Sequence, residues 1–266
     1  MPFKPCTEQF DSLATRPLQN SMVGDLAALH EPGINLVLGT RTFSADALEA
    51  LRQVNAQELT LQHGASHGGA KYGLFNANNI APQDLPKTLR AGLFGILPHH
   101  HGNLAVAHDL GLMLQDVAGV YNNAPLTISA IANVPGAQGV FHHDNFTEHR
   151  WLITLPTGSA PGTWVLDDFA RDHGIMLDQA MNGAGSSKGW QHNNYGRPTA
   201  LWNHLIREAP VGRVLGWHGE ETGTPRLHSE PDVLTPEQTR ITLIATPTAM
   251  LERQSQRARA YKPGNT

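Results

Sequence analysis

The sequence predicts a mainly β protein with flanking helices (α+β), built as a β-sandwich or jelly-roll barrel with a helical N-terminal layer. Short β-rich runs dominate the chain after residue 125, and clusters of Pro, Gly and Asn separate them. Apolar helical patterns precede these runs, and 26 Gly and 18 Pro residues suit a fold with many turns. The β-rich runs cover residues 126–132, 150–155, 163–166, 213–217 and 240–245.

The N-terminal half supplies the predicted helical layer. Four prolines punctuate residues 1–33, so we expect a loosely packed lead-in with one short helix around 22–30. The apolar run 34–38 predicts a strand. A helix is expected to begin after Ser44, which suits an N-cap, with Asp46 in the first turn where the helix dipole favours an acid. A single domain is therefore predicted over residues 34–250, its helical layer covering 34–125.

The remaining segments are assigned from their residue spacing. Residues 62–79 are rich in Gly, His and Asn without a period, which predicts a loop. A second helix is predicted over 103–120, with the buried stripe Leu104, Leu110, Leu114 and Val117. Residues 172–209 interrupt the β-rich half and are interpreted as an insertion or lid, with a helix over 198–208. The polar tail 251–266 is expected to form a surface helix that frays.

Composition limits the classes of function. The formal net charge is −4, the pI is about 6.4 and no run of Lys or Arg occurs, which argues against binding nucleic acid. The single cysteine, Cys6, excludes an intramolecular disulfide framework. No segment approaches the roughly 18 apolar residues of a membrane span. We therefore expect a cytoplasmic protein without a membrane partner, acting on a small molecule, with a homodimer left open. The 15 histidines favour metal chemistry or proton transfer.

The stretch around His142 carries the strongest chemical signal. On an extended strand His142 and Asp144 point to the same face and His143 to the other. An imidazole and a carboxylate facing one cavity supply two ligands of a facial metal site, and a distant histidine would supply the third. His228 is the favoured candidate and His218 the rival. Two histidines and one carboxylate with open coordination positions are typical of non-haem Fe(II) oxygenases.

Arg240 extends this pattern. It begins a predicted strand twelve residues after His228, and its guanidinium can hold a carboxylate through two parallel hydrogen bonds. Thr242 lies on the same strand face and offers a hydroxyl to the same carboxylate. A dicarboxylate co-substrate needs this arrangement, because one end binds the metal while the other end binds the guanidinium.

With His142-x-Asp144, His228 and Arg240-x-Thr242, the sequence resembles the Fe(II)/2-oxoglutarate-dependent dioxygenase superfamily. The resemblance implies a cupin-like double-stranded β-helix. It further implies that His142, Asp144 and His228 bind Fe(II), that Arg240 and Thr242 hold the distal carboxylate of 2-oxoglutarate, and that dioxygen is the oxidant.

The sequence also looks like an uncharacterised bacterial domain-of-unknown-function family over most of residues 30–245. Two features depart from that family's pattern: Ser229 replaces an arginine after the distal histidine, and the insertion 172–209 is long. These departures concern the choice of substrate. The matching stretches are 34–37, Arg41, 141–144, 161–164, 228–231 and Arg240.

Further candidates surround this core of the site. Ser129 and Asn133 precede the metal motif on a predicted strand and are candidates for contact with the co-substrate. His143 and Asn145 are candidates for contact with the substrate, with exposure at the surface as the alternative. The insertion either closes over a small polar substrate or simply anchors itself to the barrel. Its candidate substrate residues are Trp190, His192, Tyr195 and Arg197.

The predicted function is a non-haem Fe(II) and 2-oxoglutarate-dependent dioxygenase that hydroxylates a small polar metabolite or an amino-acid derivative. In this class the co-substrate is decarboxylated to succinate as the substrate is oxidised. One alternative is another cupin-type metalloenzyme, a hydrolase or isomerase that uses Zn, Mn or Ni. The other alternative is a non-catalytic protein that binds or handles metal, as the surplus of histidine suggests.

Overall fold

Two facing sheets form the centre of the molecule. The computed structural model describes residues 6–9, 18–54, 70–94, 97, 102–137, 139, 141–167, 181–182, 197–198 and 206–260. The larger sheet has the strand order β2-β3-β11-β6-β13-β5-β4, and the smaller has the order β1-β10-β7-β12. The larger sheet comprises β2 (Ser21–Val23), β3 (Leu36–Leu38), β4 (Lys71–Ile80), β5 (Leu126–Asn133), β6 (His149–Thr154), β11 (Val214–His218) and β13 (Arg240–Pro247). The smaller sheet comprises β1 (Cys6–Gln9), β7 (Trp164–Leu166), β10 (Ile206–Glu208) and β12 (His228–Ser229).

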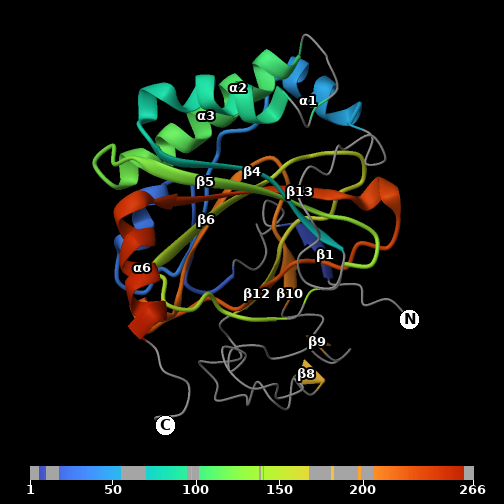
Figure 1. Ribbon diagram of the computed structural model, residues 1–266. Helices are drawn as coiled ribbons and strands as arrows, with labels where there is room; N and C mark the ends of the chain where they lie inside the picture. Colours follow the sequence, from blue (N-terminus) through green and yellow to red (C-terminus); the bar gives the residue numbers. More distant parts are fainter. Residues whose placement is uncertain are drawn as a thin grey trace.

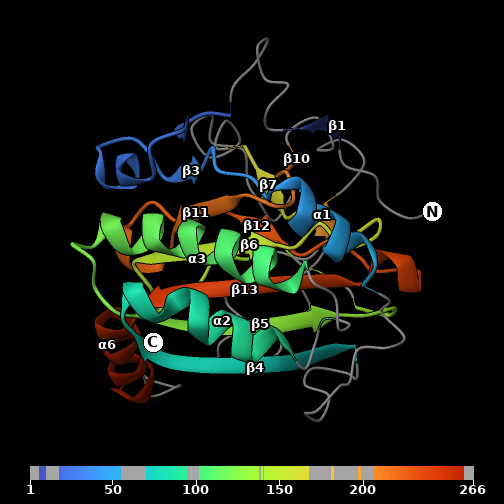
Figure 2. The ribbon, with the colours of Figure 1, turned by 90° about the horizontal axis from the view of Figure 1, so that it is seen from above.

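The helices cover the outer face of the larger sheet. Figure 1 shows α1 (Ala45–Arg52), α2 (Leu85–Phe94) and α3 (Asn103–Val120) above the sheet, and Figure 2 shows α2 and α3 lying over its strands and running roughly along them. A fourth helix, α6 (Thr248–Ala260), follows β13 directly and stands at the end of the sheet. The predicted fold class, mainly β with a helical layer contributed by the N-terminal half, is confirmed. The remaining elements are β8 (Met181–Asn182), β9 (Arg197–Pro198) and the 3₁₀ helices η2 (Leu26–His30), η4 (Pro82–Asp84), η6 (Glu220–Thr222) and η7 (Pro236–Gln238).

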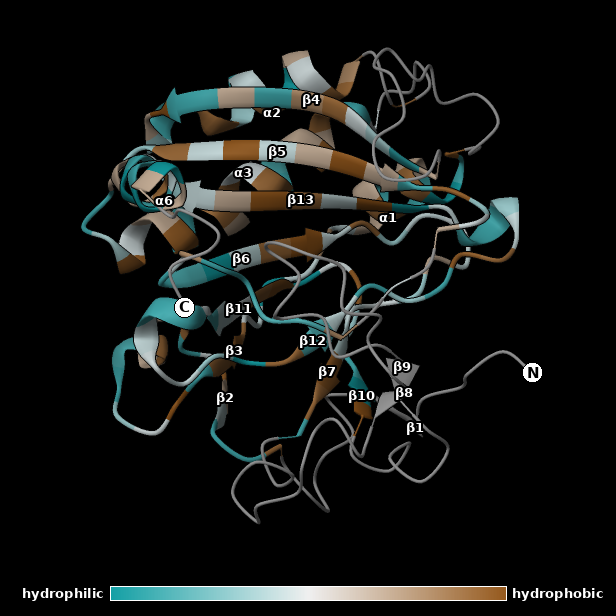
Figure 3. Cartoon of the chain, turned by 60° about the horizontal axis from the view of Figure 1, so that its bottom comes forward, coloured by the Kyte–Doolittle hydropathy of each residue, from teal (hydrophilic) through white to brown (hydrophobic). Residues whose placement is uncertain are grey.

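Alternation along the strands separates the core from the cavity between the sheets. On β13, Ile241 and Leu243 belong to the apolar cluster beneath the helices, together with Leu110 and Val117 of α3. The intervening residues therefore face the smaller sheet, because successive side chains of a strand point to opposite faces. Figure 3 shows hydrophobic segments on the central strands and on the helices packed over them. A second, smaller cluster between the sheets contains Leu36, Leu38, Leu152, Val165, Leu215 and Trp217.

The predicted helices form where their caps and apolar spacing indicate. Ser44 caps α1 by accepting from the Ala47 N–H, and its hydroxyl donates to Asp109 of α3 at 2.7 Å, which joins the two helices. Helix α3 spans the predicted range. The buried stripe is correct except for Leu104, whose side chain is 54% exposed because it lies in the first turn, near the end of the helical layer.

Three segments differ from the sequence predictions. The expected loop 62–79 contains β4 instead, a ten-residue edge strand that pairs with β5 through a bulged register. The expected helix 22–30 is divided into β2 and η2. The expected helix 198–208 ends in strand β10, which pairs with β7 in the smaller sheet. These short segments take their conformation from strand pairing with distant segments.

Helix α6 (Thr248–Ala260) accounts for residues 251–260 of the predicted polar tail. Most of the 172–209 insertion lies outside the described residues. Within the described ranges, no helix has the length and apolar character needed to cross a bilayer.

Candidate metal centre

Three side chains converge at the open edge between the two sheets. His142, Asp144 and His228 each place one potential ligand atom within 4.8 Å of the other two. The backbones of His142 and His228 exchange two hydrogen bonds, of 2.9 and 3.0 Å, so the two imidazole rings lie side by side with centroids 4.4 Å apart. Asp144 follows two residues after His142. The fold therefore brings His228 beside His142 and Asp144, which lie more than eighty positions earlier in the sequence.

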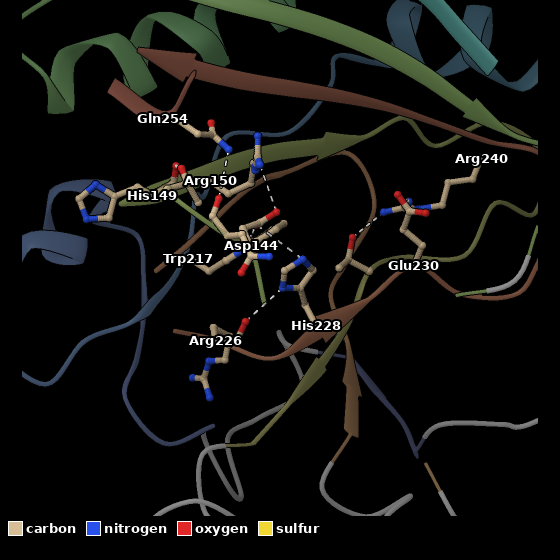
Figure 4. Close-up of polar contacts among 12 residues, drawn as sticks. Asp144, His149, Arg150, Trp217, Arg226, His228, Glu230, Arg240 and Gln254 are labelled. Carbon is tan, nitrogen blue, oxygen red and sulfur yellow. Dashed lines mark hydrogen bonds and ion pairs between the residues drawn. The ribbon is translucent and has the colours of Figure 1, made fainter. Parts of the chain in front are cut away.

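The carboxylate of Asp144 is held by two donors from the larger sheet. Arg150 Nη2 donates to Asp144 Oδ1 at 3.1 Å, and Trp217 Nε1 donates to Oδ2 at 2.8 Å (Figure 4). Burial alone would raise the pKa of Asp144, but Arg150, with further help from His228 and His142, lowers it well below its ordinary value. The group is therefore an ionised carboxylate of fixed orientation, as a metal ligand must be.

His228 is neutral and in the tautomer that a metal requires. Its Nδ1 lies 3.1 Å from the Arg226 carbonyl oxygen, which can only accept, so the proton is on Nδ1 and the lone pair is on Nε2. That Nε2 lies 3.7 Å from Asp144 Oδ2. Burial, reinforced by the adjacent His142, lowers the pKa of His228 to about 3. An unprotonated Nε2 beside a carboxylate oxygen is suited to accept a cation.

The rival ligand His218 is engaged elsewhere. Its Nε2 lies 2.8 Å from the Leu29 carbonyl oxygen, and its Nδ1 lies 2.9 Å from Thr224 Oγ1. Its ring packs against that of His149, with centroids 5.2 Å apart. Both nitrogens of His218 therefore have partners away from the group formed by His142, Asp144 and His228.

A cavity of about 200 Å³ leads from these three residues to Arg240. Apolar walls come from Ile131, Leu152 and Ile244, which lie on the cavity faces of β5, β6 and β13. In the sheet register, Lys71 of β4 lies opposite Asn133 of β5, which lies opposite Arg240 of β13. A row of three polar side chains thus crosses the far end of the cavity.

The buried Arg240 is fixed by two hydroxyls but retains unused donors. Its side chain is 0% exposed, and Nη2 donates to Thr154 Oγ1 at 3.0 Å and to Thr163 Oγ1 at 2.6 Å. Among the residues that the structure describes, Arg240 Nε and Nη1 have no hydrogen-bond partner, nor do Thr242 Oγ1 and Asn133 Oδ1. Burial lowers the pKa of Arg240, and Glu230 partly opposes this effect. Unsatisfied buried donors are costly, so this cluster is suited to an anionic ligand.

Three charged residues of the cavity, Arg150, Lys71 and Glu230, were not found from the sequence. Lys71 Nζ lies 2.6 Å from Glu230 Oε2, and Arg240 Nη1 lies 4.0 Å from Glu230 Oε1. Lys71, followed by Arg240, lowers the pKa of Glu230 against the opposing effect of burial. Alternation offered a signal for Glu230, because it lies two residues after His228. Lys71 was hidden by the erroneous loop prediction.

The other candidate residues are distributed more widely. Ser129 lies on the cavity face of β5, opposite Ile244 in the register. His143 and Asn145 do not line the cavity; His143 is half-buried, and the Asn145 carbonyl accepts from Gln254 of α6 at 3.2 Å. Arg197 lies in strand β9. Trp190, His192 and Tyr195 lie outside the described residues.

Comparisons with known proteins give only weak similarities. No family model matches the chain, and no curated protein matches it. Among solved structures, it is similar to a Pseudomonas putida prolyl-4-hydroxylase with 13% identity, covering 64% of this chain and 84% of that one, at a TM-score of 0.30. It is also similar to HygX from Streptomyces hygroscopicus, solved with nickel and 2-oxoglutarate, with 9% identity, coverage of 80% and 83%, and a TM-score of 0.38.

A third similar structure is that of C-terminally truncated Neurospora crassa T7H in its apo form. Its identity is 10%, its coverage is 80% of this chain and 82% of that one, and its TM-score is 0.35. All three TM-scores lie below 0.5, so these similarities do not decide the function of this chain. The function is therefore inferred from the residues of the site.

Proposed function

We propose that this chain is an Fe(II)- and 2-oxoglutarate-dependent dioxygenase acting on a small molecule. The observation that carries the proposal is the pairing of two features in one cavity. One is the group of His142, Asp144 and His228, and the other is the buried Arg240 with two unused donors. A ligand with one end on a metal and a carboxylate at the other end satisfies both.

The donor set suits the metal and its co-substrate. Two imidazole nitrogens and one carboxylate oxygen on one side of an ion match the ligands of non-haem Fe(II) enzymes. In the proposed complex His142, Asp144 and His228 would hold the ion. Arg240 Nε and Nη1, with the Thr242 hydroxyl, would bind the distal carboxylate of 2-oxoglutarate. When bound, Fe(II) with 2-oxoglutarate and dioxygen supplies the oxidising chemistry, with succinate and CO₂ as co-products.

The chain's own residues hold the ligand groups in position and exclude water from the cavity. Arg150 and Trp217 keep the Asp144 carboxylate oriented, while Thr154 and Thr163 keep the guanidinium of Arg240 in place. Ile131, Leu152 and Ile244 give the cavity apolar walls, which restrict water near the reacting groups. We propose hydroxylation of a small polar metabolite or amino-acid derivative as the reaction. Two features support it: Asp144 would occupy the coordination position that a halide needs, which disfavours halogenation, and the cavity is small, which favours a small substrate.

An anaerobic optical titration tests the proposal. Apoprotein is titrated with Fe(II) and then with 2-oxoglutarate, and the weak visible charge-transfer band of a metal-chelated 2-oxo acid is followed. We expect the band in the wild type and its loss in His228→Ala. In Arg240→Met, iron should still bind, and the affinity for 2-oxoglutarate should fall by at least about tenfold. His108→Ala, a change at an exposed position of α3, is the matched control and should leave the titration unchanged.

The other outcomes separate the rival functions. If iron binds but 2-oxoglutarate produces no band, the chain is a metal enzyme of another class, and assays with Zn, Mn and Ni follow. If more than one metal binds per chain and this binding survives in a His142→Ala/Asp144→Ala variant, a metal-handling protein is favoured. If no metal binds, His142 and Asp144 have only a structural role.

A further inference from the structure

A carboxylate of the protein itself lies at the end of the cavity where the co-substrate would bind. Glu230 Oε2 is 2.6 Å from Lys71 Nζ, and Glu230 Oε1 is 4.0 Å from Arg240 Nη1. Figure 4 shows the Glu230 carboxylate beside the Arg240 guanidinium, away from His228 and Asp144. Glu230 therefore pairs closely with one cation while it stands about one ångström beyond hydrogen-bond range of the other.

The backbone at Glu230 is fixed, so only its side chain can change partner. A side-chain carbon at Gly139 would overlap the Glu230 carbonyl oxygen, which shows how closely the segments around Gly139 and Glu230 pack. Ser229 Oγ donates to the same carbonyl at 2.9 Å, and Val233 exchanges backbone hydrogen bonds with the 136–137 segment. The glutamate side chain, which is 22% exposed, is the part that can change partner.

Two positions of this side chain have opposite consequences for Arg240. A carboxylate that moves fully onto Nη1 would satisfy a donor that is now unused, and a co-substrate would then compete with a group already tethered beside the guanidinium. A carboxylate held by Lys71 leaves Nε and Nη1 open. Glu208, whose Oε1 accepts from the Gly162 N–H at 2.7 Å, is a second carboxylate that acts on Arg240. The Arg240 donors that have no hydrogen-bond partner among the described residues therefore define the place for one incoming carboxylate.

We propose that Lys71 is a positioning residue that holds Glu230 away from Arg240, and that Glu230 is a built-in competitor of the co-substrate's distal carboxylate. This inference rests on the proposed function. It makes the affinity for 2-oxoglutarate depend on a residue pair rather than on Arg240 alone. The alternative is that Lys71 contacts the co-substrate directly. The two models predict different affinities for 2-oxoglutarate when Lys71 and Glu230 are both substituted.

A double-mutant cycle read out by binding tests this inference. Isothermal titration of Mn(II)-loaded protein with 2-oxoglutarate is performed on wild type, Lys71→Met, Glu230→Gln and the double variant. We expect Lys71→Met to weaken binding by about tenfold, because Glu230 closes on Arg240. Glu230→Gln should bind at least as tightly as wild type, and the double variant should return to within about threefold of Glu230→Gln. Lys87→Met, an exposed change on α2, is the control and should bind as wild type does.

Each contrary result has a definite meaning. A double variant as weak as Lys71→Met overturns the inference, because Lys71 then contacts the co-substrate directly. An unchanged affinity for 2-oxoglutarate in Lys71→Met also overturns the inference. Weaker binding of 2-oxoglutarate by Glu230→Gln overturns it as well, and this second test remains valid even if Lys71→Met folds poorly. Wild-type protein that binds Mn(II) but not 2-oxoglutarate overturns the proposed function itself, and this inference with it.

Discussion

At the scale of single residues, the outer face of the larger sheet carries a second polar cluster that serves stability. Tyr121 and His149 are joined by a hydrogen bond of 2.9 Å between Tyr121 Oη and His149 Nδ1, and Trp151 Nε1 donates to the same tyrosine oxygen at 2.9 Å. The indole N–H uses the tyrosine oxygen as an acceptor, and the phenol donates to Nδ1 when His149 is in the tautomer with its proton on Nε2. Burial, followed by the nearby rings of His218 and His30, lowers the pKa of His149 to about 3.

This cluster predicts an acid-sensitive fold. The ordinary pKa of histidine is about 6.5, so between pH 6.5 and 3 the unfolded chain binds a proton at His149 that the folded chain does not. The free energy of unfolding should therefore fall as the pH falls through this window, by up to about 1.4 kcal/mol per pH unit from this residue. Urea unfolding between pH 7.5 and 4.5 measures the slope, which should be shallower in His149→Gln.

His108→Gln is the matched control, because His108 is exposed on α3. Its slope should equal that of wild type. If His149→Gln has the wild-type slope as well, protonation of His149 is not coupled to folding, and the acid sensitivity has to come from other groups such as His228.

At the scale of elements, α6 is connected to the loop that carries Asp144. Arg253 Nη2 lies 3.2 Å from Glu148 Oε2, and Arg257 Nη1 lies 3.0 Å from Glu221 Oε2. The Gln254 side chain donates to the Asn145 carbonyl, one residue after Asp144. Each surface ion pair contributes little alone, about 0–1 kcal/mol, but together these contacts restrain the Asp144 loop and the 3₁₀ helix η6, which is hydrogen-bonded to that loop. Helix α6 therefore helps to order the metal loop before any ligand binds.

Removing these contacts should weaken metal binding more than folding. In Arg253→Met/Arg257→Met the loop has to be ordered when the metal binds, so the dissociation constant for Mn(II) should rise by roughly three- to tenfold. Competition with a fluorescent chelator measures this constant, and the urea midpoint should change little. Arg259→Met, on the same helix, should behave as wild type. Equal effects of both variants would show a general loss of surface charge and no role for these contacts.

At the scale of the whole molecule, the candidate centre joins the two sheets. His228 belongs to β12 of the smaller sheet, whereas Trp217 and Arg150, which hold Asp144, belong to β11 and β6 of the larger sheet. An ion bound by His228 and Asp144 would therefore add a connection between layers that also share a small apolar cluster and the contacts of Lys71 with Glu230 and of Arg240 with Thr163. Such a ligand stabilises the folded state by mass action.

Chelation should accordingly lower the melting temperature. At a metal concentration near 100 times the dissociation constant, binding adds about 2.7 kcal/mol, which for a chain of this size corresponds to roughly 5–10 °C. Differential scanning fluorimetry with and without EDTA measures the difference. It should vanish in His228→Ala, and its persistence there would place the stabilising metal at another site.

Much of this architecture was predictable where local pattern and tertiary structure agree. Helix α3 followed from its apolar spacing, and β13 from its β-rich alternation. The edge strand β4 was not recognised because it contains three Asn residues and pairs on one side only, so the usual alternation is missing. The cavity contact of Lys71 with Glu230 depends on that strand and on β12, and only the folded sheets bring the two residues together.

The division of each central strand between two faces has a consequence for how this protein can change. Ile241 and Leu243 support the helices, while Ile244 on the same strand lines the cavity, as Ile131 and Leu152 do on neighbouring strands. Substitutions at the cavity positions leave the packing beneath the helices intact. Ligand preference can thus change through substitutions at the cavity-facing positions, while the helix-facing positions maintain the fold. This separation suits both natural drift and laboratory evolution.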